Sequence, residues 1–416
     1  MESTRYLLIG GGLASSQAAK QLRENDPRGT ITLIGQEPYL PYDRPPLSKE
    51  FLRGEKPRAE LFFDPEQYFH DHDIDHILGV AVEQLNLAEK TASLGSGDVI
   101  QFEKALLATG GRPVRLDLPG GELSGVHYLR TLDDSAAIAA EAAPGRRAVL
   151  IGAGFIGMEV AASLAQRGVQ VTVVEAQPHI WARFADATLA GFFQDYCTQK
   201  GVTFYTSETV AEIRGHERPS SVLTRSGMEL PCDFVSIGVG IVPNVELARQ
   251  AGLAVQNGVV VNEYLQSSHP DIYAAGDVAN YQDPVFGKRR RVEHWGHAEY
   301  CGQLAGQNMA GARNPYALVT YVWSDIFDLH LEFAGDESEH DQVLLRGRFE
   351  DRRFTALYLK HGVLTAYFAI NTSSRDFPTL KRLIQEKTNL SGKEGQLQDQ
   401  TFALKELAKG ATGPGP

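Results

Sequence analysis

The chain has 416 residues, of which 43% are hydrophobic and 22% are charged, and its formal net charge at pH 7 is -12. These values are typical of a soluble globular protein with two to four domains. The acidic balance argues against nucleic acid as the main partner, and no apolar run reaches the length of a membrane span. The N-terminus leads directly into a strand pattern with no visible signal peptide, so we expect a cytoplasmic location.

The N-terminal segment carries a glycine fingerprint for a dinucleotide. Its parts are a strand over 6–9, the turn Gly10-Gly11-Gly12-Leu13-Ala14-Ser15, a helix over 13–22, a strand over 30–34 and the acid Glu37. The glycines let a pyrophosphate approach the helix N-terminus, and the acid binds ribose hydroxyls. Ser15 stands where the fingerprint usually has glycine or alanine. It is small enough for the helix to pack on the strand.

A closing strand is predicted over 105–108, and the turn Thr109-Gly110-Gly111 follows it. Residues 113–125 are rich in proline and glycine and are interpreted as a linker.

A second fingerprint begins near Arg147. Its parts are a strand over 148–151, the turn Gly152-Ala153-Gly154-Phe155-Ile156-Gly157, a helix over 156–166, a strand over 169–174 and the acid Glu175. Two fingerprints in one chain imply two dinucleotides, most simply a flavin and a nicotinamide. The carboxylate of Glu175 would bind ribose hydroxyls and repel a 2′-phosphate, which favours NADH over NADPH. Arg183, eight residues further on, could soften this preference.

Further strands are predicted over 202–205, 234–238, 259–261 and 272–275. Gly276 and Asp277 come directly after the last of them. Such a pair is common in ordinary turns. Its position after an apolar strand, downstream of both fingerprints, favours a second flavin contact in which Asp277 accepts a hydrogen bond from a ribityl hydroxyl.

From Pro315 the pattern changes to shorter alternating runs. Strands are predicted over 355–359 and 364–368, and helices over 379–387 and 402–409. Residues 410–416 are rich in glycine and proline and are predicted to form a disordered tail.

The chain has three cysteines, Cys197, Cys232 and Cys301, which are far apart in the sequence and form no C-x-x-C pair. This spacing argues against structural disulfides, iron–sulfur ligation, zinc and a catalytic redox disulfide. We therefore expect no metal site and predict packing roles for all three cysteines.

The segment Pro41-Tyr42-Asp43-Arg44-Pro45-Pro46-Leu47-Ser48-Lys49 resembles a motif of the oxygenase-coupled NADH-dependent ferredoxin reductases. That family includes the putidaredoxin, rubredoxin and biphenyl-dioxygenase ferredoxin reductases. Other matching segments are 108–113, 238–244, 268–279, 292–295 and 323–325. Phe155 and the stretch 289–309 also resemble apoptosis-inducing factor, a flavoprotein of the same superfamily.

The resemblance implies an α/β protein of the two-dinucleotide-binding flavoprotein fold, with two Rossmann-like domains and a C-terminal α+β domain. The expected domains are an FAD-binding domain over 1–113 and 243–314, an NADH-binding domain over 114–242 and a C-terminal domain over 315–409.

The resemblance also implies site roles. Lys49 would lie near the reactive edge of the flavin and pair with Glu159, and Phe155 would cover the nicotinamide pocket. These three are the expected catalytic residues, although alone each also fits a structural role. The expected cofactor-binding residues are Gly10, Gly12, Ser15, Glu37, Arg44, Lys49, Thr109, Gly110, Arg112, Gly152, Gly154, Ile156, Gly157, Glu175, Arg183, Gly238, Asp277, Glu293, His294, Trp295 and Trp323.

The implied activity is electron transfer from NADH through FAD to a ferredoxin-type iron–sulfur protein, by a monomer or homodimer. The basic run Lys288-Arg289-Arg290-Arg291 has two interpretations, a docking patch for an acidic ferredoxin or a solvated hairpin end. Two alternative functions remain: an NADH oxidase or quinone reductase, and a slow redox-sensing protein like apoptosis-inducing factor.

Overall fold

The computed structural model describes residues 2–182 and 185–409. Arg183 and the predicted tail 410–416 lie outside this part of the chain. The described residues form two compact units, each assembled from segments that are distant in the sequence. The first unit lies within residues 1–43, 58–112 and 241–320, and the second within residues 44–57, 113–240 and 321–416. None of the helices described combines the length and hydrophobicity needed to cross a bilayer.

The first unit is built on a sheet with strand order β3-β2-β1-β6-β5-β4, in which β18 also pairs with β6. The pairs among β1, β2, β3, β6 and β18 are parallel, and β4 and β5 are antiparallel. The elements are β1 (Glu2–Ile9), α1 (Leu13–Asn25), β2 (Ile31–Gly35), α3 (Glu66–Asp71), β3 (Ile74–Leu78), β4 (Val82–Asn86), β5 (Thr91–Leu94), β6 (Val99–Leu107), β7 (Gly111–Pro113), β16 (Ile241–Pro243), α7 (Glu246–Gln250), β17 (Val259–Val260), β18 (Ile272–Ala274), β19 (Ala279–Asp283), β20 (Lys288–Arg290) and α8 (Trp295–Met309).

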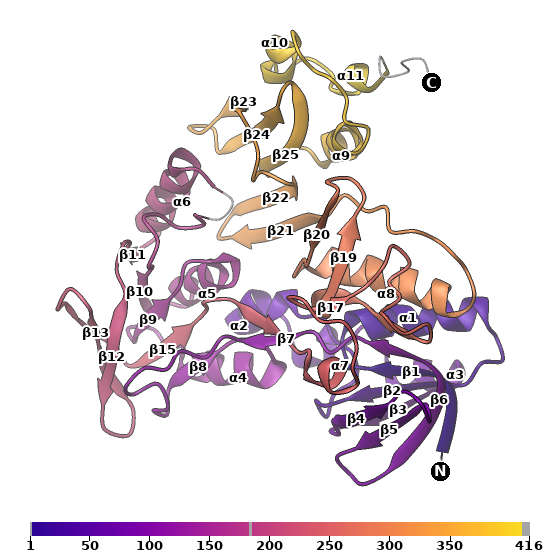
Figure 1. Cartoon of the computed structure of the whole chain (residues 1–416). Coiled ribbons are helices and arrows are strands. Elements are labelled where there is room, and N and C mark those ends of the chain that lie inside the picture. The colour runs from indigo at the N-terminus through magenta and orange to yellow at the C-terminus, as the bar shows by residue number, and fades with distance from the viewer. Residues whose placement is uncertain (1, 183–184, 410–416) are drawn as a thin grey trace. The chain divides into compact units, whose positions relative to one another are not determined.

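Small residues bring α1 and α8 close together, and the two helices lie side by side in Figure 1. A Cβ atom added at Gly302 would lie 2.3 Å from the carbonyl oxygen of Ala14, and one at Gly306 would lie 2.6 Å from that of Ala18. The two glycines are four residues apart, so they face α1 from the same side of α8. Close packing on α8 therefore fixes the helix that follows the first fingerprint.

The second unit contains a parallel five-stranded sheet with the order β11-β10-β9-β15-β8 and a small antiparallel sheet β12-β13-β14. Its elements up to residue 240 are the 3₁₀ helix η1 (Pro45–Ser48), α2 (Glu50–Arg53), β8 (Val126–Tyr128), α4 (Leu132–Glu141), β9 (Arg147–Ile151), α5 (Phe155–Gln166), β10 (Gln170–Val174), α6 (Ala187–Gln199), β11 (Val202–Tyr205), β12 (Val210–Gly215), β13 (Pro219–Thr224), β14 (Glu229–Pro231) and β15 (Phe234–Ile237).

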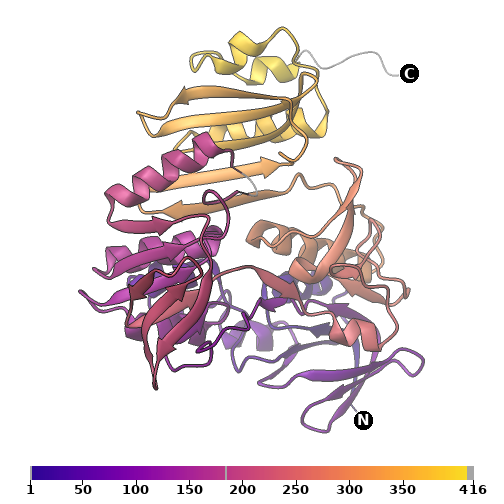
Figure 2. The same cartoon turned by 60° about the vertical axis from the view of Figure 1, so that its left-hand side comes forward.

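The C-terminal part of this unit is an antiparallel sheet with the order β21-β22-β25-β24-β23, drawn in orange to yellow in Figure 2. Its elements are β21 (Tyr321–Ile326), β22 (Leu329–Gly335), β23 (Gln342–Arg348), β24 (Arg353–Lys360), β25 (Val363–Ile370), α9 (Phe377–Gln385), α10 (Glu394–Gln398) and α11 (Lys405–Lys409). One hydrophobic core joins side chains of α5 and α6 to β22, β24 and β25. The two sheets of this unit therefore share a core.

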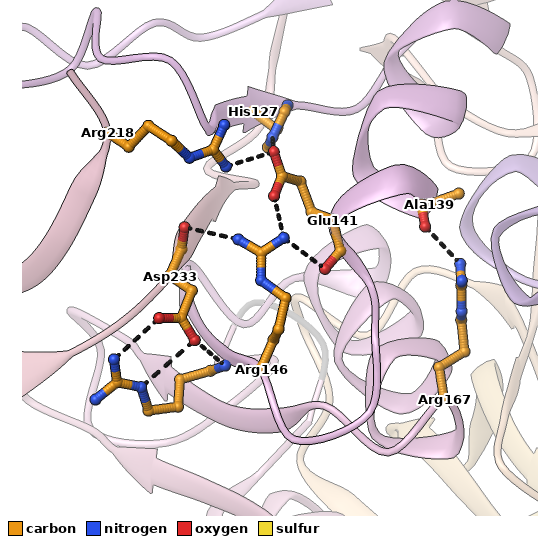
Figure 3. A network of polar contacts seen from close by, with 8 residues as sticks. His127, Ala139, Glu141, Arg146, Arg167, Arg218 and Asp233 are labelled. Atoms are coloured by element: carbon orange, nitrogen blue, oxygen red, sulfur yellow. Dashed lines mark hydrogen bonds and ion pairs between the residues drawn. The ribbon is translucent and has the colours of Figure 1, made fainter.

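Ion pairs and hydrogen bonds join the starts of β9 and β15 to the segments around them (Figure 3). Glu141 at the end of α4 accepts hydrogen bonds from Arg146 at 2.5 Å and from Arg218 at 2.6 Å. Asp233, just before β15, accepts from Arg147 at 2.9 Å. Arg167 donates to the carbonyls of Ala139 and Leu52 and so ties the end of α5 to α4 and α2. This network holds the helices around the second fingerprint.

The predicted fold class is confirmed, and each strand and helix predicted around the two fingerprints is present. Three of them are longer than predicted: β1 begins at Glu2, α1 ends at Asn25 and β6 begins at Val99. The predicted helix over 402–409 is wrong at its start, because α11 begins only at Lys405. The guanidinium of Arg346 binds the carbonyls of Leu397, Asp399, Gln400 and Phe402. Carbonyls that converge on one cation cannot also point along a helix axis, so this segment stays irregular.

We expect Gly302→Ala to destabilise the protein by about 1–3 kcal/mol, because the added methyl group overpacks the contact between α1 and α8. Gly191 in α6 is the matched control, since a Cβ there meets no described atom within 4 Å. Gly191→Ala should stabilise by about 0.5–1 kcal/mol through helix propensity alone. Urea unfolding of both variants measures the difference, and equal effects would contradict the packing account.

Candidate functional site

The first fingerprint loop leaves open space in front of α1. Gly10 has φ +124°, and a Cβ there would lie 2.2 Å from the carbonyl oxygen of Ala108. Gly12 is the N-cap of α1, where no side chain caps the helix, and a Cβ on Gly12 would meet nothing within 4 Å in the described part of the chain. Unpaired N–H groups at a helix N-terminus with open space before them fit a pyrophosphate.

Glu37 lies just after β2, the strand that follows this loop and α1. Its carboxylate accepts a hydrogen bond of 2.5 Å from the Tyr42 hydroxyl. Ser15 is fully buried in the first turn of α1, so the serine is accommodated at the third fingerprint position.

The second fingerprint loop has the same construction. Gly152 has φ +101°, and a Cβ there would lie 2.5 Å from the carbonyl oxygen of Gly238. Gly154 is the N-cap of α5, and a Cβ on it would again meet no described atom within 4 Å. A Cβ on Gly157 would lie 2.2 Å from the carbonyl oxygen of Gly152. This loop therefore requires glycine at its third position, whereas the first loop accepts Ser15.

Glu175 lies beside the second loop. Its carboxylate accepts hydrogen bonds from the backbone N–H of Ala153 at 2.6 Å and of Gln177 at 2.8 Å. Ile156, next to the N-terminus of α5, is 47% exposed and is one of the few large apolar side chains on the surface. An acid and an exposed apolar side chain thus lie at the same loop. Such a pair suits a nucleotide, which has both polar and aromatic parts.

The segment 44–57 belongs to the second unit and is anchored there by its backbone. Arg44 donates to the Arg130 carbonyl at 2.6 Å, Ser135 donates to the Leu47 carbonyl at 2.5 Å, and Ser163 donates to the Ser48 carbonyl at 2.7 Å. These bonds fix η1 against α4 and α5. The bond from Ser163 ends on Ser48, the residue before Lys49, and so helps to place Lys49.

A buried ion pair stands at the end of this segment. The ammonium of Lys49 lies 3.1 Å from a carboxylate oxygen of Glu159 in α5, and both side chains are 5% exposed. The ring of Trp323 in β21 lies 5.3 Å from the same ammonium. The predicted pairing of Lys49 with Glu159 is therefore present, and Trp323 is brought to it.

Two residues at this ion pair were missed by the sequence analysis. Ser48 and Ser324 both donate hydrogen bonds to the carboxylate of Glu159. Ser48 lies inside the motif over 41–49 and Ser324 directly follows Trp323. In the sequence, the two serines are marked only by lying within or beside segments that resemble the reductase family. Nothing in the sequence indicates that both donate to Glu159.

Phe155 lies at the first position of α5 and packs against Trp181, with ring centroids 5.4 Å apart. Trp181 in turn contacts Phe193 and Phe368. Phe155 is only partly buried, so it forms the outer end of an aromatic cluster. This placement agrees with either role considered for it, a cover for a nicotinamide or a core aromatic.

The expected flavin contacts between residues 277 and 295 lie in the first unit. Asp277 lies in a 3₁₀ turn after β18, and the His294 side chain caps α8 by accepting from the N–H of Gly296 at 3.2 Å. The indole of Trp295 donates to Asp43 at 2.8 Å. Glu293 forms an ion pair with Arg291 at 2.6 Å.

The turn after β6 is tied to the segment after β16. Thr109 donates to the Asn244 carbonyl at 2.7 Å, and Arg112 pairs with Glu246 at 2.8 Å on the surface. These bonds hold the turn that contains Gly110.

The structure sorts the predicted cofactor residues into two sets. The first-fingerprint residues, Glu37, the turn around Gly110 and the segment 277–295 lie in the first unit, and the second-fingerprint residues, Glu175 and Gly238 lie in the second. Arg44, Lys49 and Trp323 also lie in the second unit. Arg183 lies outside the described residues.

The basic run over 288–291 is not a free turn. Residues 288–290 form β20, which pairs with β19. Arg289 donates to the carbonyls of Val261 and Asn280, and Arg290 pairs with the fully buried Asp283 at 3.2 Å. Arg291 donates to the Asp277 carbonyl and is only 9% exposed in its side chain. Lys288 and Arg289 are the exposed members of the run.

The three cysteines are buried in three different core clusters, as their predicted packing roles require. Burial raises the pKa of the Cys197 thiol and of the Cys232 thiol to about 12. Both thiols therefore stay protonated at neutral pH and are poor nucleophiles.

Two sequence-family models match the chain. The family described as "Pyridine nucleotide-disulphide oxidoreductase" matches residues 4–302, and the one described as "Reductase C-terminal" matches residues 321–408. Rhodocoxin reductase of Rhodococcus erythropolis is 35% identical to this chain over 400 residues, which cover 96% of this chain and 93% of that protein.

Two solved structures resemble the chain along nearly its whole length. A ferredoxin reductase for the CYP199A2 system from Rhodopseudomonas palustris has a TM-score of 0.93 at 34% identity, covering 98% of this chain and 100% of that one. The reductase in a covalent putidaredoxin reductase–putidaredoxin complex has a TM-score of 0.93 at 29% identity, covering 99% of both chains.

We expect Gly12→Val to give folded protein that lacks flavin, because the valine side chain would enter the open space before α1 without striking the protein. Gly154→Val is the matched variant at the second loop. It should keep its flavin and lose binding of the nicotinamide nucleotide. Visible absorbance after purification measures the flavin, circular dichroism checks the fold, and titration with NADH measures binding at the second loop. A yellow Gly12→Val protein would contradict the assignment of the first loop.

Proposed function

The chain belongs to the pyridine nucleotide-disulphide oxidoreductase family, and we propose that it passes electrons from NADH through FAD to a ferredoxin-type iron–sulfur protein. The observation that carries this proposal is the pair of fingerprint loops, each with an open helix N-terminus and an acid close by. The relatives that match along the chain are reductases of small electron carriers by name. The protein is thus an oxidoreductase.

FAD fits the first unit. The N-terminus of α1 would bind its pyrophosphate, Glu37 its adenosine ribose and Asp277 its ribityl chain, with the turn over 109–112 and residues 293–295 along its length. Bound FAD supplies hydride acceptance and the release of electrons one at a time. The protein supplies position and charge. We assign residues 1–113 and 243–314 to this FAD-binding domain.

NADH fits the second unit. The N-terminus of α5 would bind the pyrophosphate, and Glu175 would exchange its bonds to backbone N–H groups for the ribose hydroxyls. Lys49 and Glu159 would orient the nicotinamide carboxamide, and Phe155 would cover the ring. We assign residues 114–242 to the NADH-binding domain and residues 315–409 to the C-terminal domain.

The acceptor is proposed to be an external one-electron carrier. The three cysteines are buried in separate cores and cannot form the redox disulfide that other members of the family use as an internal acceptor, as the family name implies. Among the four cations of the basic run, we assign docking to Lys288 and Arg289, because these two are exposed. Arg290 and Arg291 are engaged by acids of their own unit.

The direct test is anaerobic reduction of the yellow protein by NADH, followed by mixing with oxidised ferredoxin, with air or with a quinone. We expect ferredoxin to re-oxidise the flavin fastest. Faster re-oxidation by quinone or oxygen would make the protein a quinone reductase or NADH oxidase. A reduced flavin that persists in air and with ferredoxin would favour a redox sensor.

The wild type should prefer NADH over NADPH, and Glu175→Arg should reverse the preference by removing the carboxylate that repels a 2′-phosphate. We expect about a tenfold or larger change in the ratio of kcat/KM values, equal to about 1.4 kcal/mol or more. Steady-state kinetics with both nucleotides measure the ratio. A wild type that favours NADPH would contradict the role of Glu175.

Replacing Lys288 and Arg289 by glutamate should slow ferredoxin reduction at low salt, because exposed charges mainly accelerate encounter. The difference should shrink as salt screens the charges. Reduction of the flavin by NADH should not change. The control replaces Arg28 and Arg313, exposed cations of the same unit, by glutamate. An equal loss of the ferredoxin reduction rate in the control would show that the effect comes from the net charge of the protein and not from this patch.

A further inference from the structure

Three elements of the second unit, η1, α5 and β21, meet at the carboxylate of Glu159 in α5, and Lys49 directly after η1 joins them. Oxygen Oε1 accepts a hydrogen bond of 2.5 Å from the hydroxyl of Ser324 in β21 and lies 3.1 Å from the ammonium of Lys49. Oxygen Oε2 accepts a hydrogen bond from the hydroxyl of Ser48 in η1. All four side chains are nearly or fully buried.

The burial of these groups makes the two hydroxyls important. A buried carboxylate that lacks hydrogen-bond donors is costly, and an ion pair alone rarely repays the loss of water. The serines provide donors to both oxygens, so the carboxylate cannot rotate without breaking a bond. Lys49 then has one well-defined partner oxygen and keeps two of its three N–H donors for other groups.

We propose that Ser48 and Ser324 are positioning residues for the step in which NADH reduces the flavin. They hold Glu159 so that the ammonium of Lys49 is presented in one place, beside the ring of Trp323. The inference deepens the proposed function and rests on it. It adds a task for the C-terminal domain, which supplies Ser324 from its edge strand β21 to the Lys49–Glu159 centre.

The key variant is Ser324→Ala, which removes one hydrogen bond to the charged carboxylate. A hydrogen bond to a charged group contributes about 1.5 kcal/mol or more. If that contribution stabilises the transition state and not the ground state, its loss slows the reaction by about tenfold or more. We expect the limiting rate of flavin reduction by NADH to fall by about tenfold. The NADH concentration that gives half this rate should change less. Ser324→Thr should restore the rate, since it keeps the hydroxyl.

Two further variants separate positioning from stability. Ser135 is a fully buried serine that donates to the carbonyl of Leu47 in the same segment and does not touch Glu159. Ser135→Ala should lower the melting temperature and leave the reduction rate within about twofold, less than 0.5 kcal/mol. Ser48→Ala should slow reduction as Ser324→Ala does. It tests the same idea if the Ser324 variant does not fold.

A double-mutant cycle tests whether Ser324 acts through Glu159. In the Glu159→Gln background, Ser324→Ala should have little further effect, because the carboxylate is already gone. The visible absorption spectrum of the bound flavin, recorded before NADH is added, should change with Ser324→Ala and not with Ser135→Ala. This readout does not depend on turnover.

Three outcomes would overturn the inference: a wild-type reduction rate in Ser324→Ala and Ser48→Ala, an equal loss in Ser135→Ala, or full additivity with Glu159→Gln. A wild type whose flavin NADH does not reduce would instead overturn the proposed function. The two failures are therefore distinguishable.

Discussion

The buried ion pair between Lys49 and Glu159 is the constraint around which the second unit is arranged. Two charges removed from water need close polar partners. Removing one partner of a buried ion pair typically destabilises the folded protein by about 3–5 kcal/mol. That requirement brings η1, α5 and β21 to one point, although their residues are more than a hundred positions apart. The hydrophobic core shared by the parallel sheet and the C-terminal sheet holds the same elements together by apolar contacts.

The two fingerprint loops show how a backbone path can be fixed while the space in front of it stays open. In each loop, the first glycine faces a carbonyl oxygen that any side chain would strike, and the glycine at the helix N-cap faces no described atom. A side chain is therefore excluded at the first glycine by the protein itself, whereas the space at the N-cap glycine is open. This arrangement lets a pyrophosphate approach the helix N-terminus, where the first N–H groups of a helix have no acceptor within the helix and favour an anion.

The arginines illustrate how little a run of charges says without its surroundings. Arg290 and Arg291 look like part of a surface patch in the sequence, yet each binds an acid in its own unit. Arg346, in a strand of the C-terminal sheet, binds four carbonyls and fixes the path between α10 and α11. A guanidinium with five donors satisfies whatever acceptors folding brings near, so its role depends on neighbours that are distant in the chain.

The sequence by itself determined the local features of this protein. Both fingerprints, the strands and helices around them and the acids Glu37 and Glu175 follow from patterns a few residues long, because glycine turns and strand periodicity are local properties. The pairing of Lys49 with Glu159 came from a family resemblance. Only the tertiary structure placed Ser48 and Ser324 on that carboxylate, Trp181 on Phe155, and Arg290 and Arg291 on their acids. A serine or arginine carries no local mark of its partner, since hydrogen bonds between distant segments exist only once the chain has folded.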